Sequence, residues 1–401
     1  MNVPELRFSE FADEWKRILL NEISDRVMYG MNSAAIPYDG ENKYLRITDI
    51  NENTRKFTPN PLTSPAGEIE DKYRLKEGDI VFARTGASVG KSYLYNEKDG
   101  KLFFAGFLIK FSITKGNPFF IFTQTLRDNY NKWVQLMSMR SGQPGINAEE
   151  YKSFYFLIPS LSEQHRIATF FTSVDEKLTQ LKKKKTLLAQ YKKGVMQKIF
   201  SQELRFKNEN GKYLPEWIRK TLGEVTERIG DGLHGTPSYT ENTGFYFING
   251  NNLINGSIVI NETTKEVDLE TYNQNRKGLN ENTLLISING TIGNVARYQN
   301  EKIMLGKSAG YFNFKENTNF YYYLLNADHV QNYFISELTG STIKNLSLKT
   351  LREAEFLLPS LPEQTKIANF LSAIDEKINY CSTQIEKTEL WKKGLLQKMF
   401  V

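Results

Sequence analysis

An internal repeat limits the folds open to this chain more than any other feature of its sequence. Residues 156–164 (FLIPSLSEQ) return 200 positions later as residues 356–364 (FLLPSLPEQ). The match continues without a gap to Phe200 and Phe400, with 19 identities in 45 positions. The 401 residues therefore form two similar halves, and such a repeat indicates repeated structural units.

The starts of the two halves are also alike, although this match is weaker. The tetrapeptide ELRF occurs at residues 5–8 and at 203–206, and a Glu-Trp pair follows each copy, ending at Trp15 and at Trp217. A variable block lies between each start and each near-constant end. The sequence therefore predicts four regions, which are globular blocks at 1–153 and 201–353 and conserved helical segments at 154–200 and 354–401.

Each near-constant segment has the pattern of one long helix. Ser160 and Glu163 fit a capping box, and Ser360 and Glu363 fit another. After the caps, apolar side chains alternate in steps of four and three residues, which is the spacing of a coiled-coil seam. The expected seam positions are Ile167, Phe171, Val174, Leu178, Leu181 and Leu188 in the first helix, and Ile367, Leu371, Ile374, Ile378, Cys381 and Ile385 in the second.

The order of the segments predicts how the two helices pair. The first helix leaves the first block and leads to the second block, whereas the second helix begins at the second block. We therefore expect an antiparallel two-helix coiled coil with one globular block at each end and an approximate two-fold axis. A chain with this symmetry suits a target in two parts, as dimeric DNA-binding proteins suit paired half-sites.

Both variable blocks predict α+β globules with mixed sheets and helices. Short runs of β-branched and aromatic residues bounded by turns indicate strands. The expected strands lie at 44–50, 79–83 and 106–111 in the first block and at 245–249, 283–287 and 310–314 in the second, with helices near 118–139 and 319–338. The two blocks thus share a scaffold while most of their surface side chains differ, as in two domains that recognise different sequences.

Composition excludes several classes of protein. With 40% hydrophobic and 24% charged residues, the chain can bury cores, so disorder is not expected. A single cysteine, Cys381, excludes a disulfide framework and a thiolate metal cluster, and three scattered histidines predict no metal site. No apolar run approaches about 18 residues and the start lacks a signal-peptide core, so we expect a cytoplasmic protein without a membrane segment.

The positive charge is concentrated in one segment. Residues 154–200 contain nine Lys or Arg against three Asp or Glu, which equals the net charge of +6 of the whole chain. The run at 182–185 (KKKK), which the second helix lacks, is either a solvated helix face or a contact with a phosphate backbone or an acidic partner. Lys192-Lys193-Gly194 recurs in the second helix, which leaves a shared partner-docking surface open.

Three short motifs resemble catalytic or cofactor-binding signatures, but each lacks an essential part. Residues 86–92 (GASVGKS) have three residues between the glycines where a Walker A loop needs four, and the counterpart at 290–294 has no lysine. Asn117-Pro118 lacks the second proline of an adenine-holding loop, so it predicts a helix start. Asp175-Glu176-Lys177 lacks the upstream Pro-Asp of a nuclease and predicts a solvated ion pair on the helix surface. We therefore expect no catalytic residue and no cofactor in this chain.

Several polar side chains are candidates for contacts with DNA. Residues 229–239 (IGDGLHGTPSY) predict an ordered functional loop, with a plain connector as the alternative. Arginines suit guanine edges and asparagines suit adenine edges, although such a residue taken alone is more often a surface or phosphate contact than a base contact. The candidates are Arg46, Arg84, Lys91, His234, Thr236, Asn249, Asn251, Arg276, Asn289 and Arg297.

The paired motifs resemble those of the specificity (S) subunits of Type I restriction-modification systems. The resemblance covers the Leu-Arg-Phe…Glu-Trp starts, the Leu-x-Pro-Ser-Leu-x-Glu-Gln helix openings and the Lys-Lys-Gly-x-x-Gln-Lys-x-Phe endings. It implies two target recognition domains, each recognising half of a bipartite double-stranded DNA site. It also implies paired helices that set the half-site spacing and dock two modification (methyltransferase) subunits. S-adenosylmethionine, ATP and Mg are implied only for those subunits and for the restriction (translocase) subunits.

Two other functions are compatible with the sequence. One is a stand-alone nucleotide-dependent enzyme that uses residues 86–92, for which ATP binding that is lost in Lys91→Ala would be evidence. The other is a coiled-coil adaptor whose globular ends bind protein and not DNA. An adaptor predicts that exchange of residues 1–153 leaves genomic methylation unchanged, whereas a DNA-recognition subunit predicts that half of the methylated motif changes.

Overall fold

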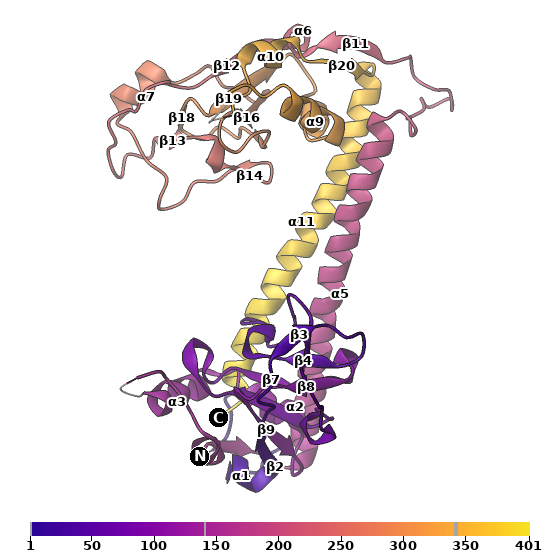
Figure 1. Cartoon of the computed structure of the whole chain (residues 1–401). Coiled ribbons are helices and arrows are strands. Elements are labelled where there is room, and N and C mark those ends of the chain that lie inside the picture. Colours follow the sequence, from indigo (N-terminus) through magenta and orange to yellow (C-terminus); the bar gives the residue numbers. More distant parts are fainter. Residues whose placement is uncertain (1, 140–141, 341–343) are drawn as a thin grey trace. The chain divides into compact units, whose positions relative to one another are not determined.

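The chain folds into two compact units, each with its own globular block (Figure 1). This computed structural model describes residues 2–139, 142–340 and 344–401. The first unit contains the residues up to 182 together with 383–401, and the second contains 183–382. Each unit therefore includes parts of both long helices. The four predicted regions follow the repeat of the sequence, so their boundaries differ from those of the compact units.

A four-stranded antiparallel sheet forms the centre of each globular block, and its strands have the same spatial order in both units. In the first unit the order is β2 (Ser24–Tyr29), β9 (Leu108–Ile113), β6 (Asp79–Ala83) and β7 (Ser92–Leu94). In the second unit it is β12 (Thr226–Asp231), β19 (Ala309–Phe314), β16 (Thr283–Ser287) and β17 (Val295–Arg297). The inner strands are buried along almost their whole length, as their continuous apolar runs predict.

Smaller two-stranded sheets complete each unit. The first unit has β1 (Lys16–Leu19) with β10 (Tyr155–Ile158), β3 (Ala35–Pro37) with β5 (Thr63–Pro65), and β4 (Lys43–Leu45) with β8 (Leu102–Phe104). The second has β11 (Ile218–Thr221) with β20 (Glu355–Leu358), β14 (Leu253–Ile254) with β15 (Ser257–Ile258), and β13 (Tyr246–Ile248) with β18 (Ile303–Leu305). The strand expected at 44–50 ends early, because Asp49 accepts a hydrogen bond from the Arg46 backbone (2.9 Å) and starts a 3₁₀ turn, η1 (Ile47–Asp49).

Short helices pack around the sheets. They are α1 (Leu20–Ile23), α2 (Pro118–Gln124), α3 (Asp128–Ser138) and α4 (Ala148–Lys152) in the first unit, and α6 (Leu222–Val225), α7 (Leu269–Asn275), α8 (Thr318–Leu325), α9 (Asp328–Ser336) and α10 (Leu348–Glu353) in the second. The helix expected near 118–139 is two helices, because the Thr125 hydroxyl donates back to the Phe122 carbonyl (2.6 Å) where α2 ends. Asn117 caps α2, as its sequence predicted. The predicted α+β class and repeated scaffold are confirmed.

The two long helices are α5 (Leu161–Phe200) and α11 (Leu361–Lys398), and they pair antiparallel in both units. In the first unit Lys392 Nζ lies 2.6 Å from Asp175 Oδ1, and in the second Lys192 Nζ lies 2.7 Å from Asp375 Oδ1. The early part of each helix thus contacts the late part of the other. The prediction of a solvated ion pair within residues 175–177 is wrong for Asp175, because the antiparallel pairing places a seam lysine beside it.

The predicted seam positions lie on the inner faces of these helices. None of them is exposed. The buried ones are Ile167, Phe171, Val174 and Leu178 in α5 and Ile367, Leu371, Ile374, Cys381 and Ile385 in α11, whereas Leu181, Leu188 and Ile378 have intermediate exposure. The seam is most exposed near the middle of α5, where the lysine run 182–185 also lies on the surface.

A buried ion pair fixes the first turn of each long helix. Arg7 donates from Nε and Nη2 to both carboxylate oxygens of Glu163, at 2.7 Å each, and Arg205 contacts Glu363 in the same way at 3.1 and 2.8 Å. The two carboxylates are 1% and 0% exposed. Such two-point contacts hold both partners in one orientation. The repeated starts and the repeated helix openings of the sequence therefore bind each other.

Each globular core includes the end of the long helix that arrives from the other half of the sequence. In the first unit the ring of Phe400 lies 5.9 Å from Trp15 and 5.1 Å from Phe120, measured between ring centroids. Arg127 Nη1 donates to the Val401 carbonyl (2.7 Å). In the second unit Phe200 is the counterpart, at 6.0 Å from Phe320. Neither core is complete without both helices.

We expect Phe400→Ala to destabilise the first unit. Removing a buried aromatic ring leaves a cavity and costs about 3–5 kcal/mol of unfolding free energy. Hydrogen exchange measured by mass spectrometry should show faster exchange in β6 and β9 and unchanged exchange in β16 and β19. Phe200→Ala is the matched control and should affect the second unit instead. Faster exchange of β16 in Phe400→Ala would contradict the assignment of this ring to the first core.

Candidate nucleic-acid interface

The same position of the repeated scaffold carries different side chains in the two units. Arg46 precedes η1 in the first unit, and Asn249 precedes η5 (Gly250–Asn252) in the second. In both, the backbone NH bonds the side chain three residues later, Asp49 at 2.9 Å and Asn252 at 3.0 Å. The local backbone is therefore alike, and the polar side chain that it carries at this point differs between the units.

The two side chains are held by different partners. Arg46 donates from Nε and Nη2 to the buried carboxylate of Asp49, at 2.9 and 2.7 Å, and this contact raises the pKa of its guanidinium. Asn249 Oδ1 accepts a hydrogen bond from Ser308 Oγ at 2.8 Å, which leaves its amide NH₂ for other contacts. A guanidinium and a carboxamide suit guanine and adenine edges respectively.

A polar cavity of about 180 Å³ in the second unit brings two predicted residues together. Asn249 and Asn251 both line it, together with Tyr239 and Lys265. Tyr239 packs against Phe247 with ring centroids 6.0 Å apart, and Lys265 Nζ lies 6.0 Å from the Tyr239 ring. Carboxamides, one aromatic ring and one cation are the side chains that contact base edges and phosphates.

Residues 232–239 of the predicted loop lead into this cavity, whereas residues 229–231 form the end of β12. His234 and Thr236 are exposed, and His234 Nε2 lies 2.7 Å from Asp231 Oδ2. A side chain at Gly232 would collide with the Leu305 carbonyl, so only glycine lets the loop pass so close to β18. The loop is therefore fixed at its base while its polar residues remain accessible.

In the first unit, Lys91 is buried and forms an ion pair with Glu52. Its side chain is 7% exposed, and its ammonium lies 2.5 Å from Glu52 Oε2 and 3.4 Å from the Ile50 carbonyl. The hydrogen bond from Lys91 lowers the pKa of the Glu52 carboxyl. The geometry therefore favours neither a DNA contact nor a nucleotide phosphate at Lys91, because Glu52 and the Ile50 carbonyl already bind its ammonium.

The remaining candidates Arg84, Arg276 and Asn289 do not line the cavity at Asn249. Arg84 stacks over Tyr29, with its guanidinium carbon 5.0 Å from the ring centroid, and its buried Nε has no hydrogen-bond partner within the described residues. Arg276 is exposed after α7. Asn289 forms an isolated β-bridge with Asn345.

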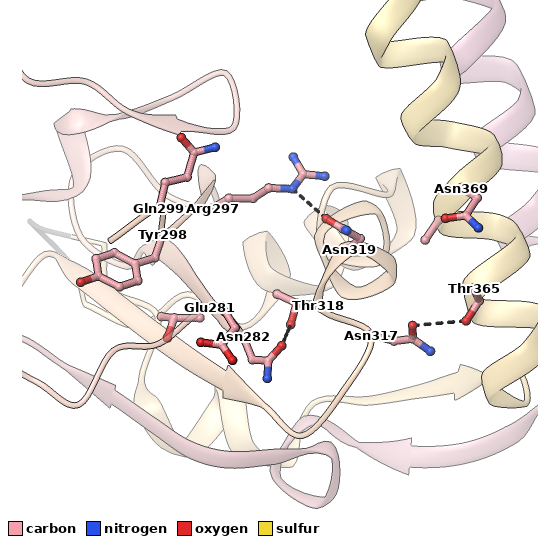
Figure 2. Close-up of a pocket in the computed structure, with 12 residues that line it drawn as sticks. Glu281, Asn282, Arg297, Tyr298, Gln299, Asn317, Thr318, Asn319, Thr365 and Asn369 are labelled. Atoms are coloured by element: carbon pink, nitrogen blue, oxygen red, sulfur yellow. Dashed lines mark hydrogen bonds between the residues drawn. The ribbon is translucent and has the colours of Figure 1, made fainter. Parts of the chain in front are cut away.

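Arg297 lines a second polar cavity of about 340 Å³ in the second unit, shown in Figure 2. Its guanidinium carbon lies 3.4 Å from the centroid of the Tyr322 ring, and its Nε donates to Asn319 Oδ1 at 3.2 Å. Thr365 and Asn369 from α11 form the opposite wall (Figure 2). This cavity shares no lining residue with the one at Asn249, so Arg297 belongs to a different part of the surface.

Tyr239 and Lys265 are among the cavity residues that the list of candidates did not contain. Lys265 lies in a polar loop without any distinguishing motif, and Tyr239 ends the 229–239 loop without a pattern that marks a base contact. Within residues 2–139, 142–340 and 344–401, no cluster of three or more His, Cys, Asp or Glu side chains could hold a metal ion. None of the helices in the described part of the chain combines the length and hydrophobicity that crossing a membrane requires.

Comparison with protein families identifies the repeat. The model of a family described as Type I restriction modification DNA specificity domain matches this chain twice, at residues 13–189 and 214–389. The chain belongs to this specificity-domain family. The two matches cover both globular blocks and most of both long helices.

Individual relatives are similar along nearly the whole chain. A putative type I restriction enzyme MjaX specificity subunit of Methanocaldococcus jannaschii is 25% identical over 98% of this chain and 95% of its own length. The type I restriction enzyme StySPI specificity subunit of Salmonella potsdam is 23% identical over 90% and 82%. The solved S subunit of a Type-I restriction-modification system from M. genitalium has a TM-score of 0.60 at 17% identity and covers 100% of this chain and 99% of its own. A solved chain described under complex assembly and conformational transition of the type I R-M system has a TM-score of 0.57 at 18% identity, covering 96% and 97%.

We expect Lys91→Met to lower the unfolding free energy of this specificity-domain chain by less than about 1 kcal/mol at pH 7, because Glu52 stays hydrated when its partner is removed. The pKa of Glu52 is lower in the folded chain than the value of 4.5 for a free glutamate. Its ion pair with Lys91 therefore stabilises the fold at pH values above 4.5, and this contribution is lost as the pH falls through the lowered pKa. Denaturant unfolding at pH 7 and near pH 3 should therefore give a smaller difference between variant and wild type in acid. ATP binding that Lys91→Met abolishes would contradict this structural role.

Proposed function

We propose that this chain is the DNA-recognition subunit of a Type I restriction-modification complex. One observation carries the proposal beyond family membership: two units share one scaffold and present different polar side chains at its equivalent position, Arg46 in one and Asn249 in the other. A protein that recognises two different half-sites needs such a pair of domains. Each unit would thus recognise one half of a bipartite double-stranded DNA site.

We infer that the long helices set the distance between the two half-sites. Both α5 and α11 contribute to both cores, so a change in helix length cannot be absorbed by a loose linker. A rigid helix advances about 1.5 Å per residue, whereas B-DNA advances about 3.4 Å per base pair. The length of the helix pair is therefore the natural determinant of the spacing between half-sites.

We further propose that this chain supplies recognition and no catalysis. Two modification (methyltransferase) subunits would dock on it and methylate adenine with S-adenosylmethionine, after flipping the base into their own pockets. Restriction (translocase) subunits would add cleavage that depends on ATP and Mg. The burial of Lys91 supports this division, because it removes the one lysine of this chain that resembled a nucleotide-binding residue.

Exchange of the first globular block tests the division of recognition between the units. Replacing residues 1–153 with the equivalent block of another specificity subunit should change one half of the methylated motif and preserve the other half. Long-read sequencing of host DNA detects the methylated adenines directly. A chimera with an unchanged methylated motif would contradict the proposal and would favour a protein-binding adaptor.

The cavity at Asn249 gives a sharper test on the assembled methyltransferase complex. Lys265→Gln should weaken binding to every DNA sequence by a similar factor and reduce the dependence on salt by about one released counterion. Asn251→Ala should instead relax the preference at one base pair of one half-site, by about 1–3 kcal/mol. Lys349→Gln, an exposed lysine on α10, is the control. Equal effects of Lys265→Gln and Lys349→Gln would exclude this cavity from the interface.

A further inference from the structure

Phe107 is the one phenylalanine, among the residues that the structure describes, whose side chain is exposed. Its exposed fraction is 59%, whereas the other phenylalanines are buried or partly buried. It lies in the short turn between β8 and β9 of the first unit. A single exposed apolar residue needs no explanation by itself, so its surroundings decide what Phe107 can do.

The turn that carries Phe107 is fixed by backbone hydrogen bonds. The NH of Leu108 donates to the Ala105 carbonyl at 2.9 Å, which closes the turn. The NH of Gly106 donates to the Met31 carbonyl at 2.7 Å, which ties the turn to the segment after β2. A fixed backbone limits the positions of the ring, so a contact between this ring and a ligand costs less conformational entropy.

The same turn is bonded to the backbone beside both arginines of the first unit that are candidates for guanine edges. The NH of Ala105 donates at 3.0 Å to the carbonyl of Leu45, which is the residue before Arg46. The NH of Arg84 donates to the Phe107 carbonyl at 3.1 Å. Phe107 therefore lies on a turn between two positions that carry a guanidinium.

The guanidinium of Arg84 is held by an aromatic ring. Its carbon lies 5.0 Å from the centroid of the Tyr29 ring, and within the described residues no carboxylate or carbonyl accepts a hydrogen bond from it. Phosphate oxygens and the O6 and N7 atoms of guanine are acceptors that suit a guanidinium. The group next to Phe107 is therefore complementary to nucleic acid and not to an apolar protein surface.

Ser308 is the counterpart of Phe107 in the second unit. Its carbonyl accepts the NH of Ile288 at 3.0 Å, which is the bond that Arg84 makes in the first unit. The Ser308 hydroxyl donates to Asn249 Oδ1 at 2.8 Å, so this position adjoins the candidate interface. The two units therefore differ here in one chemical property: the side chain can form hydrogen bonds in the second unit and only apolar contacts in the first.

We propose that Phe107 contacts the C5 methyl group of a thymine in the half-site that the first unit recognises. This inference rests on the proposed function and names one chemical group that the first unit recognises. A phenyl ring forms none of the hydrogen bonds that the other base edges require, and the thymine methyl is the apolar group that the major groove presents. The second unit, which has Ser308 at this position, makes no such contact.

Uracil substitution in the DNA tests the contact, because uracil pairs as thymine does and lacks only the methyl group. Each thymine of the methylated motif is replaced in turn, and fluorescence anisotropy measures binding of each duplex to the assembled methyltransferase complex. One replacement in the half-site that follows residues 1–153 in the block exchange should weaken binding about fourfold, the effect of one buried methyl-sized group. A first half-site without thymine, or a methyl effect absent from it, would overturn the inference.

Phe107→Ser assigns the effect to this side chain. Serine is the residue of the second unit at this position, and loss of an exposed ring should leave the melting midpoint unchanged. The variant should bind the thymine duplex about fourfold more weakly than wild type does and should bind the thymine and uracil duplexes equally. Its affinity should respond as before to base changes in the second half-site.

Leu136→Ser is the matched control, because it removes an exposed apolar side chain from α3 of the same unit. This control should keep the preference of wild type for thymine over uracil. The inference fails if Phe107→Ser still distinguishes the two duplexes. It also fails if this variant weakens both by the same factor, which a ring wedged between base pairs would produce. If the wild-type complex shows no sequence preference at all, the proposed function itself fails.

Discussion

The ion pair at the first turn of each long helix is the contact on which the rest of each unit depends. Arg7 with Glu163, and Arg205 with Glu363, join the start of each half to the opening of its helix across more than 150 residues of chain. The carboxylates are fully buried, so loss of either arginine would leave an unpaired charge in the interior, which costs about 3–5 kcal/mol. The pair thereby fixes where each helix begins relative to its globular block, and through the helix the place of every seam residue.

The two halves share this framework but carry different polar side chains on it. Sheet order, helix starts and seam lysines are shared, whereas Arg46 and Asn249 differ at one equivalent point. The seam lysines also differ from ordinary polar interruptions of a coiled coil. Lys192 and Lys392 each form an ion pair with an aspartate on the opposite helix, and these pairs favour this antiparallel register over a shifted register.

Local and repeated sequence patterns made much of the fold predictable, whereas contacts between residues far apart in the sequence could not be predicted. The repeat, the four-three spacing and the central apolar runs predicted the paired helices and the inner strands. Nothing local shows that Asp175 faces Lys392, because that contact depends on the register between two helices. The environment of Lys91 could not be predicted for a related reason. A glycine-rich turn has the same sequence pattern whether its lysine is exposed to solvent or contacts Glu52. Asn249 and Asn251 were candidates because of their chemistry and line one cavity, whereas Lys265 is 14 residues further along the chain and lines that cavity only because of the fold.

The placement of Phe400 has a consequence for the order in which the units fold during synthesis. The second unit is continuous in sequence and ends at residue 382, so the ribosome has delivered all of it before the last part of the first unit appears. The first unit is incomplete until Phe400 has been synthesised. Synthesis of the 200 residues after Phe200 takes roughly 10–40 s at about 5–20 residues per second. During that interval Trp15 and Phe120 lack their partner ring, so the nascent first unit is the natural client for chaperones, although its residues emerge first.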